Sequence, residues 1–399
     1  MQDQFELGRQ AFLQGVSCFE RGALAEAEAA FVQALQHVPG RASVLLNLGL
    51  TRVRLQRHAD AVPVLQQALA AEAEAADGWA ALGFSLSALG RWEEALAALE
   101  RAQALGWPDV QVALRRAEAL ARLARWADAQ AAYTHLLARH PALPDAWMAL
   151  GELHRQAGRL DEEAAAYRNG QAHGADAAWA SYLLAAVTHS GDVARAPLGY
   201  VRNLFDEYAA DFDHHLVDQL GYQGHRTLVA SLPVPATATL GRVLDLGCGT
   251  GLCGTLVRSR ASHLTGVDVS PDMVAKASER GLYDRLQEAD LHRFLSDTDQ
   301  TWDVVLAADV FIYVGALDQA FALLQPRVST GGWLAFTVEA GAPGTGARLL
   351  PSLRYSHAPD YLRDLADRNG FDWHSTRSAP IRYDQRQPVP GDYVVLRRR

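Results

Sequence analysis

The chain has 399 residues, of which 49% are hydrophobic and 21% charged, with a formal net charge of −9. This composition is ordinary for a globular protein, and the length predicts two or three domains. The acidic balance argues against a nucleic-acid partner, because phosphate binding needs a basic surface. We see no signal peptide and no apolar run long enough to span a bilayer, so we expect no membrane association. The three cysteines have no zinc-type spacing, and an odd number without a disulfide framework indicates a reducing cytoplasm.

The first half of the chain repeats with a period of 34 residues. A small residue recurs at one position of the period: Gly15, Gly49, Gly83, Ala117 and Gly151. Twelve positions later come Ala27, Ala61, Ala95, Ala129 and Glu163, and four further on come Phe31, Leu65, Leu99, Tyr133 and Tyr167. We expect the small residues to allow close helix approach, and the large ones to fill the gap between repeats. The pattern resembles the tetratricopeptide repeat, a helix–turn–helix unit of this length, in five copies over residues 8–174.

The resemblance implies a concave groove that binds a peptide or protein partner and is lined by the first helix of each repeat. The family's groove positions are apolar in the first three repeats and charged in the last two: Phe12, Val16, Phe19, Leu46, Leu50, Val53 and Phe84, then Glu118, Arg122, Glu152 and Arg155. The same residues could instead form the core between helices, or the interface of a homodimer, because periodicity does not separate these alternatives. Residues 175–190 are expected to form a capping helix, which completes a first domain over residues 1–192.

A joint with Pro197 and Gly199 follows the repeats. Phe205, Tyr208, Phe212 and His215 then recur at helical spacing, which predicts one face of a helix. We expect residues 193–236 to form a linker and a helical lid over the active site.

Strand-like and helical segments alternate from Arg242 onward. The predicted strands are 242–246, 263–268, 284–288, 302–309, 332–339, 371–378 and 392–397, and the predicted helices are 251–260, 271–281, 316–327 and 358–369. This alternation predicts a Rossmann-like α/β domain over residues 237–399, with a seven-stranded, mostly parallel sheet. The predicted fold is therefore an α-helical solenoid followed by an α/β domain.

The first strand of that domain ends in Asp245-Leu-Gly247-Cys-Gly249-Thr-Gly251. Glycines at alternate positions allow a tight turn and the close approach of a ligand to the backbone. Three more acids stand at or just after the following strands: Asp268, Asp290 and Asp309. Four carboxylates around one crevice do not suit a pyrophosphate, but they suit a nucleoside whose other end is cationic.

These motifs resemble those of class I S-adenosylmethionine-dependent methyltransferases, and the whole chain resembles bacterial predicted methyltransferases that carry tetratricopeptide repeats. The resemblance implies that Gly247 and Gly249 pass under the methionine part of the methyl donor, that Asp245 helps to hold its amino group and that Asp268 takes the ribose. It also places Val269 and Met273 beside the adenine, Asp290 and the Leu291 amide at the adenine amino group, and Asp309 near the sulfonium. Cys248 and Gly251, in the glycine-rich loop, and Tyr208, on the lid, complete the expected donor-binding set.

A competing pattern overlaps this motif. Residues 249–254 fit the dinucleotide fingerprint G-x-G-x-x-G. In a dinucleotide site the first glycine follows the strand directly, whereas Gly249 comes after Asp245 and Gly247. The methyltransferase motif is therefore favoured.

Methyl transfer from a sulfonium needs alignment and exclusion of water more than it needs a catalytic base. Our candidates for a base or an acceptor-orienting group are His215, His357 and Tyr313. Each has a structural alternative: His215 as a packing residue of the lid, His357 as part of a polar surface loop, and Tyr313 as the start of a helix. Arg354 could pair with an acceptor carboxylate, or it could be a solvated surface charge.

The leading hypothesis is a methyltransferase that releases S-adenosylhomocysteine and acts on a small molecule or peptide recruited through the repeats. The alternative is a repeat scaffold whose methyltransferase domain binds the donor but contributes little catalysis. The fourteen histidines show no metal-ligand spacing, so no metal is expected.

Overall fold

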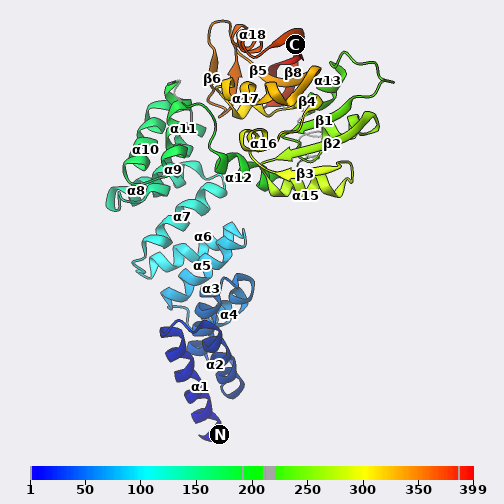
Figure 1. Cartoon of the computed structure of the whole chain (residues 1–399). Helices are drawn as coiled ribbons and strands as arrows, with labels where there is room; N and C mark the ends of the chain where they lie inside the picture. Colours follow the sequence, from blue (N-terminus) through cyan, green and yellow to red (C-terminus); the bar gives the residue numbers. More distant parts are fainter. Residues whose placement is uncertain (1, 191–192, 210–211, 213–220, 385–386) are drawn as a thin grey trace. The chain divides into compact units, whose positions relative to one another are not determined.

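The structure is a computed structural model, which describes residues 2–190, 193–209, 212, 221–384 and 387–399 (Figure 1). The chain divides into two compact units, Met1–Ala175 and Asp176–Arg399. Each unit is described by itself below.

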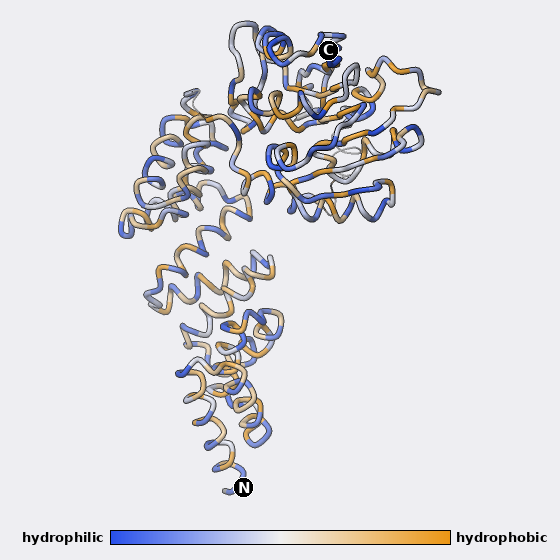
Figure 2. The backbone as a smooth tube through the Cα atoms, viewed as in Figure 1, coloured by the Kyte–Doolittle hydropathy of each residue, from blue (hydrophilic) through white to orange (hydrophobic). Residues whose placement is uncertain are grey.

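Helix pairs build the first unit, as the repeat predicts (Figure 1). The pairs are α1 (Gln2–Glu20) with α2 (Leu24–His37), α3 (Ala42–Arg54) with α4 (His58–Ala71), α5 (Ala76–Ala88) with α6 (Trp92–Ala104), α7 (Val110–Arg122) with α8 (Trp126–Arg139), and α9 (Pro144–Gln156) with α10 (Leu160–Ala172). Figure 2 shows apolar and polar residues alternating along these helices, the pattern of a helix that buries one face. In the described part of the chain, no helix combines the length and apolarity needed to cross a membrane.

The recurring small and large residues meet within each helix pair. A Cβ atom added to Gly15 would lie 2.6 Å from the Phe31 ring, and one added to Gly83 would lie 2.7 Å from the Leu99 side chain. Gly15 is on α1 and Phe31 on α2, so the large residue closes the gap inside one repeat. The large residues also belong to apolar clusters with the next repeat, Phe31 with Val44 and Leu48 and Leu99 with Val112, as expected for residues that fill the gap between repeats.

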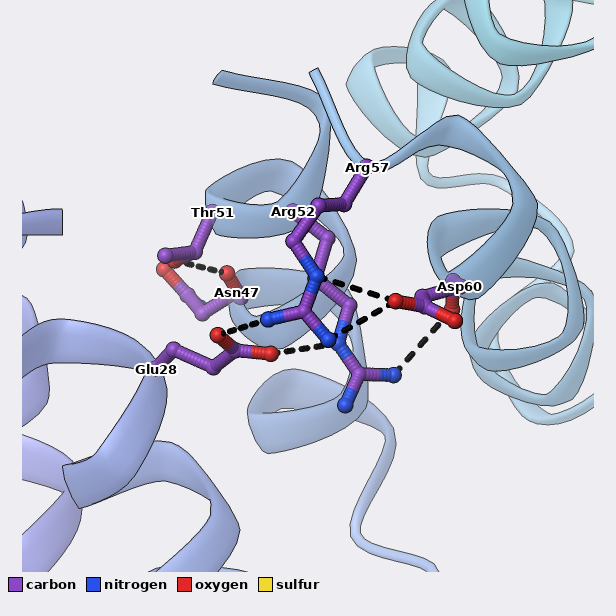
Figure 3. A network of polar contacts seen from close by, with 6 residues as sticks. All are labelled: Glu28, Asn47, Thr51, Arg52, Arg57 and Asp60. Carbon is purple, nitrogen blue, oxygen red and sulfur yellow. Dashed lines mark hydrogen bonds and ion pairs between the residues drawn. The ribbon is translucent and has the colours of Figure 1, made fainter. Parts of the chain in front are cut away.

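An ion-pair network joins the first two repeats (Figure 3). Glu28 of α2 accepts a hydrogen bond from Arg52 Nε of α3 at 2.8 Å and another from Arg57 Nη1, just before α4, at 2.6 Å. Arg57 also pairs with Asp60 of α4 at 2.7 Å. The side chains of Glu28 and Arg52 are only 15% and 18% exposed, so this pair is better shielded from solvent than the pairs of Arg57. The network links α2 of the first repeat to the helices of the second.

The fifth repeat departs from the others at one buried position. Glu163 on α10 is 1% exposed and replaces the fully buried alanines of the preceding four repeats. Its Oε2 atom has no hydrogen-bond partner among the described residues. Burial raises the pKa of Glu163 to about 7, against the opposing charge of Arg155. This carboxyl therefore weakens the repeat at neutral and higher pH.

The second unit begins with helices that precede its sheet: α11 (Ala177–Thr188), α12 (Leu198–Tyr208) and α13 (Gly224–Ala230). We expected residues 175–190 to cap the repeats, but α11 groups with the second unit. Tyr182 explains why, because its hydroxyl donates to the Leu353 carbonyl at 2.6 Å and its ring lies 6.3 Å from that of Tyr355.

The sheet alternates with helices along the chain. Its strands are β1 (Gly241–Leu246), β2 (Ala261–Asp268), β3 (Arg285–Glu288), β4 (Trp302–Ala307), β5 (Val328–Ala340), β6 (Ala347–Leu349), β7 (Tyr355–His357), β8 (Phe371–Asp384) and β9 (Gln387–Arg398). The helices are α14 (Leu252–Val257), α15 (Pro271–Glu279), α16 (Leu291–Asp297), α17 (Asp318–Leu324) and α18 (Pro359–Arg368). All seven predicted strands are present, and the fold class is confirmed.

The sheet order is β3-β2-β1-β4-β5, with all four pairings parallel. The C-terminal hairpin adds β9 antiparallel to β5, and β8 antiparallel to β9. The short strands β6 and β7, which we did not predict, extend the end of β5 and raise the number of strands to nine in the described chain. Residues Tyr355–His357 are thus a buried strand, not the polar surface loop that we expected around His357.

Helices cover both faces of this sheet. Phe294 of α16, Phe321 of α17 and Leu362 of α18 belong to one apolar cluster with the inner strands. Leu228 of α13 and Val257 of α14 belong to the cluster of the opposite face. A parallel sheet covered on both faces leaves the carboxyl ends of its strands as the place for a ligand.

Candidate functional site

A cavity of about 310 Å³ lies where β1, β2 and β4 end. Eleven of the fifteen residues predicted for the site line it: Tyr208, Asp245, Gly247, Cys248, Gly249, Asp268, Val269, Asp290, Leu291, Asp309 and Tyr313. Gly251, Met273 and His357 are not among its lining residues. His215 lies outside the described residues.

The three glycines of the loop after β1 have different surroundings, although all have positive φ. A Cβ at Gly247 would overlap Val310, and one at Gly251 would lie 3.1 Å from the Tyr283 ring. At Gly249, by contrast, an added Cβ would meet nothing within 4 Å. Gly249 therefore borders open space, so a ligand can approach the backbone there, whereas the other two glycines are required by the protein's own packing.

Asp245 is buried at the end of β1, with 1% of its surface exposed. The hydroxyl of Tyr283 donates to its Oδ2 atom at 2.6 Å. Burial raises the pKa of Asp245 to about 7; this hydrogen bond opposes the rise and the charge of Asp268 adds to it. The Tyr283 ring occupies the space that a Cβ at Gly254 or Gly266 would need. The glycines thus make room for the residue that orients Asp245.

Asp268, at the end of β2, is bound by backbone amides. Gly249 N–H donates to its Oδ2 at 2.8 Å and Ser270 N–H donates to its Oδ1 at 3.0 Å. Burial raises the pKa of this carboxyl, and the amide hydrogen bonds oppose the rise. The Ser270 hydroxyl donates to Asp206 of α12 at 2.5 Å, which links α12 to this strand end.

Asp290 caps the first turn of α16, where it accepts from the backbone N–H groups of His292 and Arg293. Its Oδ1 lies 3.7 Å from Arg195 Nη1 and 3.7 Å from His292 Nδ1. Burial alone would raise the pKa of Asp290, but these hydrogen bonds and charges lower it overall. Arg195 also forms a backbone bridge with Val314, so the segment before α12 borders the cavity on this side.

Two arginines and two acids meet beyond the end of β4. Asp309 has a φ of +58°, and its Oδ2 lies 3.6 Å from Arg382 Nη1 of β8. Arg382 also pairs with Glu339 of β5, and both side chains are 6% exposed. Arg354 also lines the cavity; burial lowers its pKa, and Tyr313 makes the largest contribution that raises it. The Tyr313 ring lies 5.6 Å from that of Phe205 on α12, edge to face.

Gly251 and Met273 are placed against the protein itself. Gly251 begins α14 and faces Tyr283, and Met273 is fully buried on α15. His357 is also fully buried. Its Nε2 lies 2.9 Å from the Val314 carbonyl and 3.1 Å from that of Gly315, and burial lowers its pKa to about 4. A neutral imidazole that donates to these carbonyls holds β7 against the segment after β4.

Sequence reasoning missed five polar residues that line the cavity: Arg195, Tyr222, His225, His292 and Arg382. His292 could have been predicted, because it follows Asp290 by two residues at the start of a helix. The others come from the segments before α12 and α13, from α13 itself and from the C-terminal hairpin. No local pattern links them to the glycine loop. The two cysteines at the site, Cys248 and Cys253, are buried, and burial raises the pKa of both thiols.

Comparisons with known proteins agree with this fold. Residues 243–332 match the family model described as a methyltransferase domain, and residues 46–110 and 114–178 match the tetratricopeptide repeat model. The fold and site thus define a methyltransferase-type domain preceded by tetratricopeptide repeats.

Methyltransferase-like protein 27 from Homo sapiens is 36% identical over 190 residues, which cover 45% of this chain and 70% of that protein. Aklanonic acid methyltransferase DauC from Streptomyces sp. (strain C5) is 27% identical over 183 residues, 42% of this chain and 80% of that protein. The solved structure of magnesium protoporphyrin IX methyltransferase (ChlM) from Synechocystis PCC 6803 with bound SAH is 18% identical, covers 51% of this chain and 99% of that one, and gives a TM-score of 0.40. The chain belongs to the methyltransferase family.

Proposed function

We propose that the protein transfers a methyl group from S-adenosylmethionine to an acceptor that enters the cavity beside Tyr313. The observation that carries the proposal is the open space at Gly249, bordered by the buried carboxylates of Asp245 and Asp268. No neighbouring atom of the described residues leaves too little space for a side chain at Gly249. Its open space beside two buried acids fits a ligand that has a cationic end and a ribose.

The residues divide the work of binding the donor. Asp245, oriented by Tyr283, would face the amino group, and Asp268 would accept from the ribose hydroxyls with the lone pairs that its two amide donors leave free. Asp290 and Leu291 would border the adenine. When bound, the donor supplies an activated methyl group on sulfur. The cavity walls contribute alignment and the exclusion of water.

Among the catalytic candidates, we retain Tyr313 as a group that orients the acceptor, because it lines the cavity. His357 makes a structural contact instead, and His215 remains a prediction. The proposed domain division is the repeat region, a lid over residues 193–236 and the catalytic domain. The lid's contacts through Asp206 and Arg195 support this assignment. The three free cysteines support a reducing, cytoplasmic location.

The test is donor binding and turnover in matched variants. Asp268→Ala removes the acid at the end of β2, and Asp272→Ala removes an exposed acid on neighbouring α15. We expect calorimetry to show weaker binding of S-adenosylmethionine, by about 10-fold or more, only for Asp268→Ala. Release of S-adenosylhomocysteine with an acceptor should fall in parallel. Absence of donor binding by the unaltered protein would refute the proposal, and donor binding without turnover across a broad acceptor panel would favour the scaffold alternative.

We propose that the first unit recruits a peptide or protein partner, as its repeats imply. The predicted groove residues Phe12 and Phe19 are half-buried; the Phe12 ring lies 5.9 Å from Phe31, and Arg54 stacks 4.1 Å above Phe19. Their remaining exposure supports a binding role alongside a packing role. If the variants Phe12→Ser and Phe19→Ser change neither partner binding nor oligomeric state, the groove and the homodimer alternative both fail.

A further inference from the structure

Arg354 differs from the other charged groups at its end of the cavity, because no carboxylate neutralises it directly. Arg382 makes ion pairs with both nearby acids, Asp309 and Glu339. Among the described residues, Arg354 forms no ion pair; burial lowers its pKa, and Tyr313 together with the charges of Glu339 and Asp309 raises it overall. An arginine that lines a cavity and has no carboxylate partner in the protein can bind the carboxylate of a ligand through its guanidinium group.

The backbone turn that precedes Arg354 is held in a fixed conformation. Leu353 has a φ of +60°, a left-handed conformation that a leucine adopts at a cost of about 1 kcal/mol. Three hydrogen bonds hold this turn: Leu350 N–H to the Arg354 carbonyl, Leu353 N–H to the Leu350 carbonyl, and the Tyr182 hydroxyl to the Leu353 carbonyl. Strain that is fixed by several contacts is typical of functional positions.

Aromatic side chains line the same cavity as Arg354. Phe205, Phe212, Tyr208, Tyr222 and Tyr313 all line the cavity. A ligand that reaches Arg354 therefore places an anionic group on the guanidinium and an apolar body against the rings.

Charge balance favours an anion at this place. The two arginines and the two acids beyond β4 cancel, and the sulfonium of the methyl donor adds one positive charge. An amine that binds as its ammonium form would add a second positive charge in a low-dielectric cavity and would have to lose a proton before transfer, whereas a carboxylate brings the total to zero. Transfer from a sulfonium to a carboxylate also ends in two neutral groups, a thioether and an ester.

We propose that the methyl acceptor carries a carboxylate, which Arg354 binds beside Tyr313 and which becomes a methyl ester. The inference rests on the proposed methyltransferase function. One carboxylate oxygen forms the new bond to the methyl carbon, and the sulfur–methyl bond breaks with its electron pair remaining on sulfur. No proton moves, because the acceptor is ionised at neutral pH.

The experiment follows the chemical stability of the transferred label. The protein is incubated with S-adenosylmethionine labelled in its methyl group and with a cell extract divided into a protein fraction and acidic, neutral and basic small-molecule fractions. Mild base releases labelled methanol from methyl esters, but leaves N-methyl, S-methyl, C-methyl and ether products intact. We expect base-labile label from the acidic small-molecule fraction or, if the carboxylate is protein-borne, from the protein fraction.

Matched variants connect the label to Arg354. Arg354→Gln should lower base-labile transfer by about 100-fold or more, and Arg354→Lys should retain part of it, because a lysine keeps the charge but loses the fork. Arg348→Gln, which changes an exposed arginine on β6, should match the unaltered protein. Donor affinity, measured by calorimetry, should be the same in all four proteins, which shows that the site is intact.

Base-stable label, or base-labile transfer at an unaltered rate in Arg354→Gln, would overturn the proposal while leaving the methyltransferase function standing. Donor binding without label transfer to any fraction would overturn both and favour the scaffold. Failure of the unaltered protein to bind the donor would refute the proposed function at its first step.

Discussion

Replacing the buried acid of the fifth repeat should stabilise the first unit. Glu163→Ala restores the residue type that the other four repeats carry at this position, where alanine is fully buried. Burial raises the pKa of Glu163 from its ordinary value of 4.5 to about 7. One pKa unit corresponds to about 1.4 kcal/mol, so the ionised carboxyl costs the folded state at most about 3.5 kcal/mol.

The sign follows from proton binding. Between pH 4.5 and about 7 the folded state holds a proton that the unfolded state releases, so stability falls as the pH rises through this window. Screening by Arg155 and the void left by the shorter side chain reduce the gain from the substitution. We therefore expect Glu163→Ala to be about 1–2 kcal/mol more stable at pH 8, and to lose that advantage by pH 5.

Hydrogen exchange of the α9 and α10 amides in the full chain, corrected for intrinsic exchange rates, measures this local stability at both pH values. Glu162→Ala is the control, because it removes an exposed acid one position earlier on the same helix. It should change the opening free energy by less than about 0.5 kcal/mol. A destabilised Glu163→Ala at pH 8, or a gain that does not depend on pH, would refute the reasoning.

Three further predictions concern the second unit. Gly249→Ala should weaken donor binding but lower the melting temperature less than Gly247→Ala does, because only the Cβ added at Gly247 overlaps Val310. Calorimetry measures the donor binding and thermal unfolding measures the melting temperature. Equal losses of melting temperature in the two variants would contradict this prediction. Donor affinity should rise as the pH increases from 5 to 8, because burial raises the pKa of Asp245 to about 7 and this carboxyl must be ionised to bind the donor's ammonium group. In Asp245→Asn the donor affinity should not depend on pH. A pH dependence of the same size in that variant would exclude this carboxyl as the cause. His357→Phe should destabilise the protein by about 1–3 kcal/mol in urea unfolding, because it leaves two buried carbonyls without their hydrogen-bond donor. A loss of catalysis at unchanged stability would instead support a chemical role for His357.

Local patterns were enough to predict the fold class. The glycine-rich loop, the acids at strand ends and the 34-residue period each lie within one segment of sequence. The strands β6 and β7 escaped prediction because three residues do not establish a period. The burial of His357 was equally invisible, since its hydrogen-bond partners, Val314 and Gly315, lie more than 40 residues earlier in the chain.

The four predicted acids show what sequence reasoning could and could not supply at the site. Their positions at strand ends were predictable, but their counterparts were not, because each acid is balanced in a different way. Asp268 accepts from backbone amides, Asp245 from a tyrosine, and Asp290 from a helix terminus with an arginine nearby. Asp309 depends on Arg382, which β8 brings from 73 positions later in the chain.

The two halves of the cavity draw their residues from different parts of the chain. The glycine-rich loop and Asp268 come from β1, β2 and the residues just after them, and Tyr283, which orients Asp245, lies between α15 and β3. The donor half of the cavity therefore depends mainly on residues 241–283. The acceptor half needs Arg382 from the C-terminal hairpin and Arg354 from the turn that Tyr182 holds. Tyr182→Phe should therefore reduce methyl transfer more than donor affinity, because it loosens the Leu353 turn without touching the glycine loop. Parallel loss of both, with measured stability unchanged, would show that the two halves do not form separately.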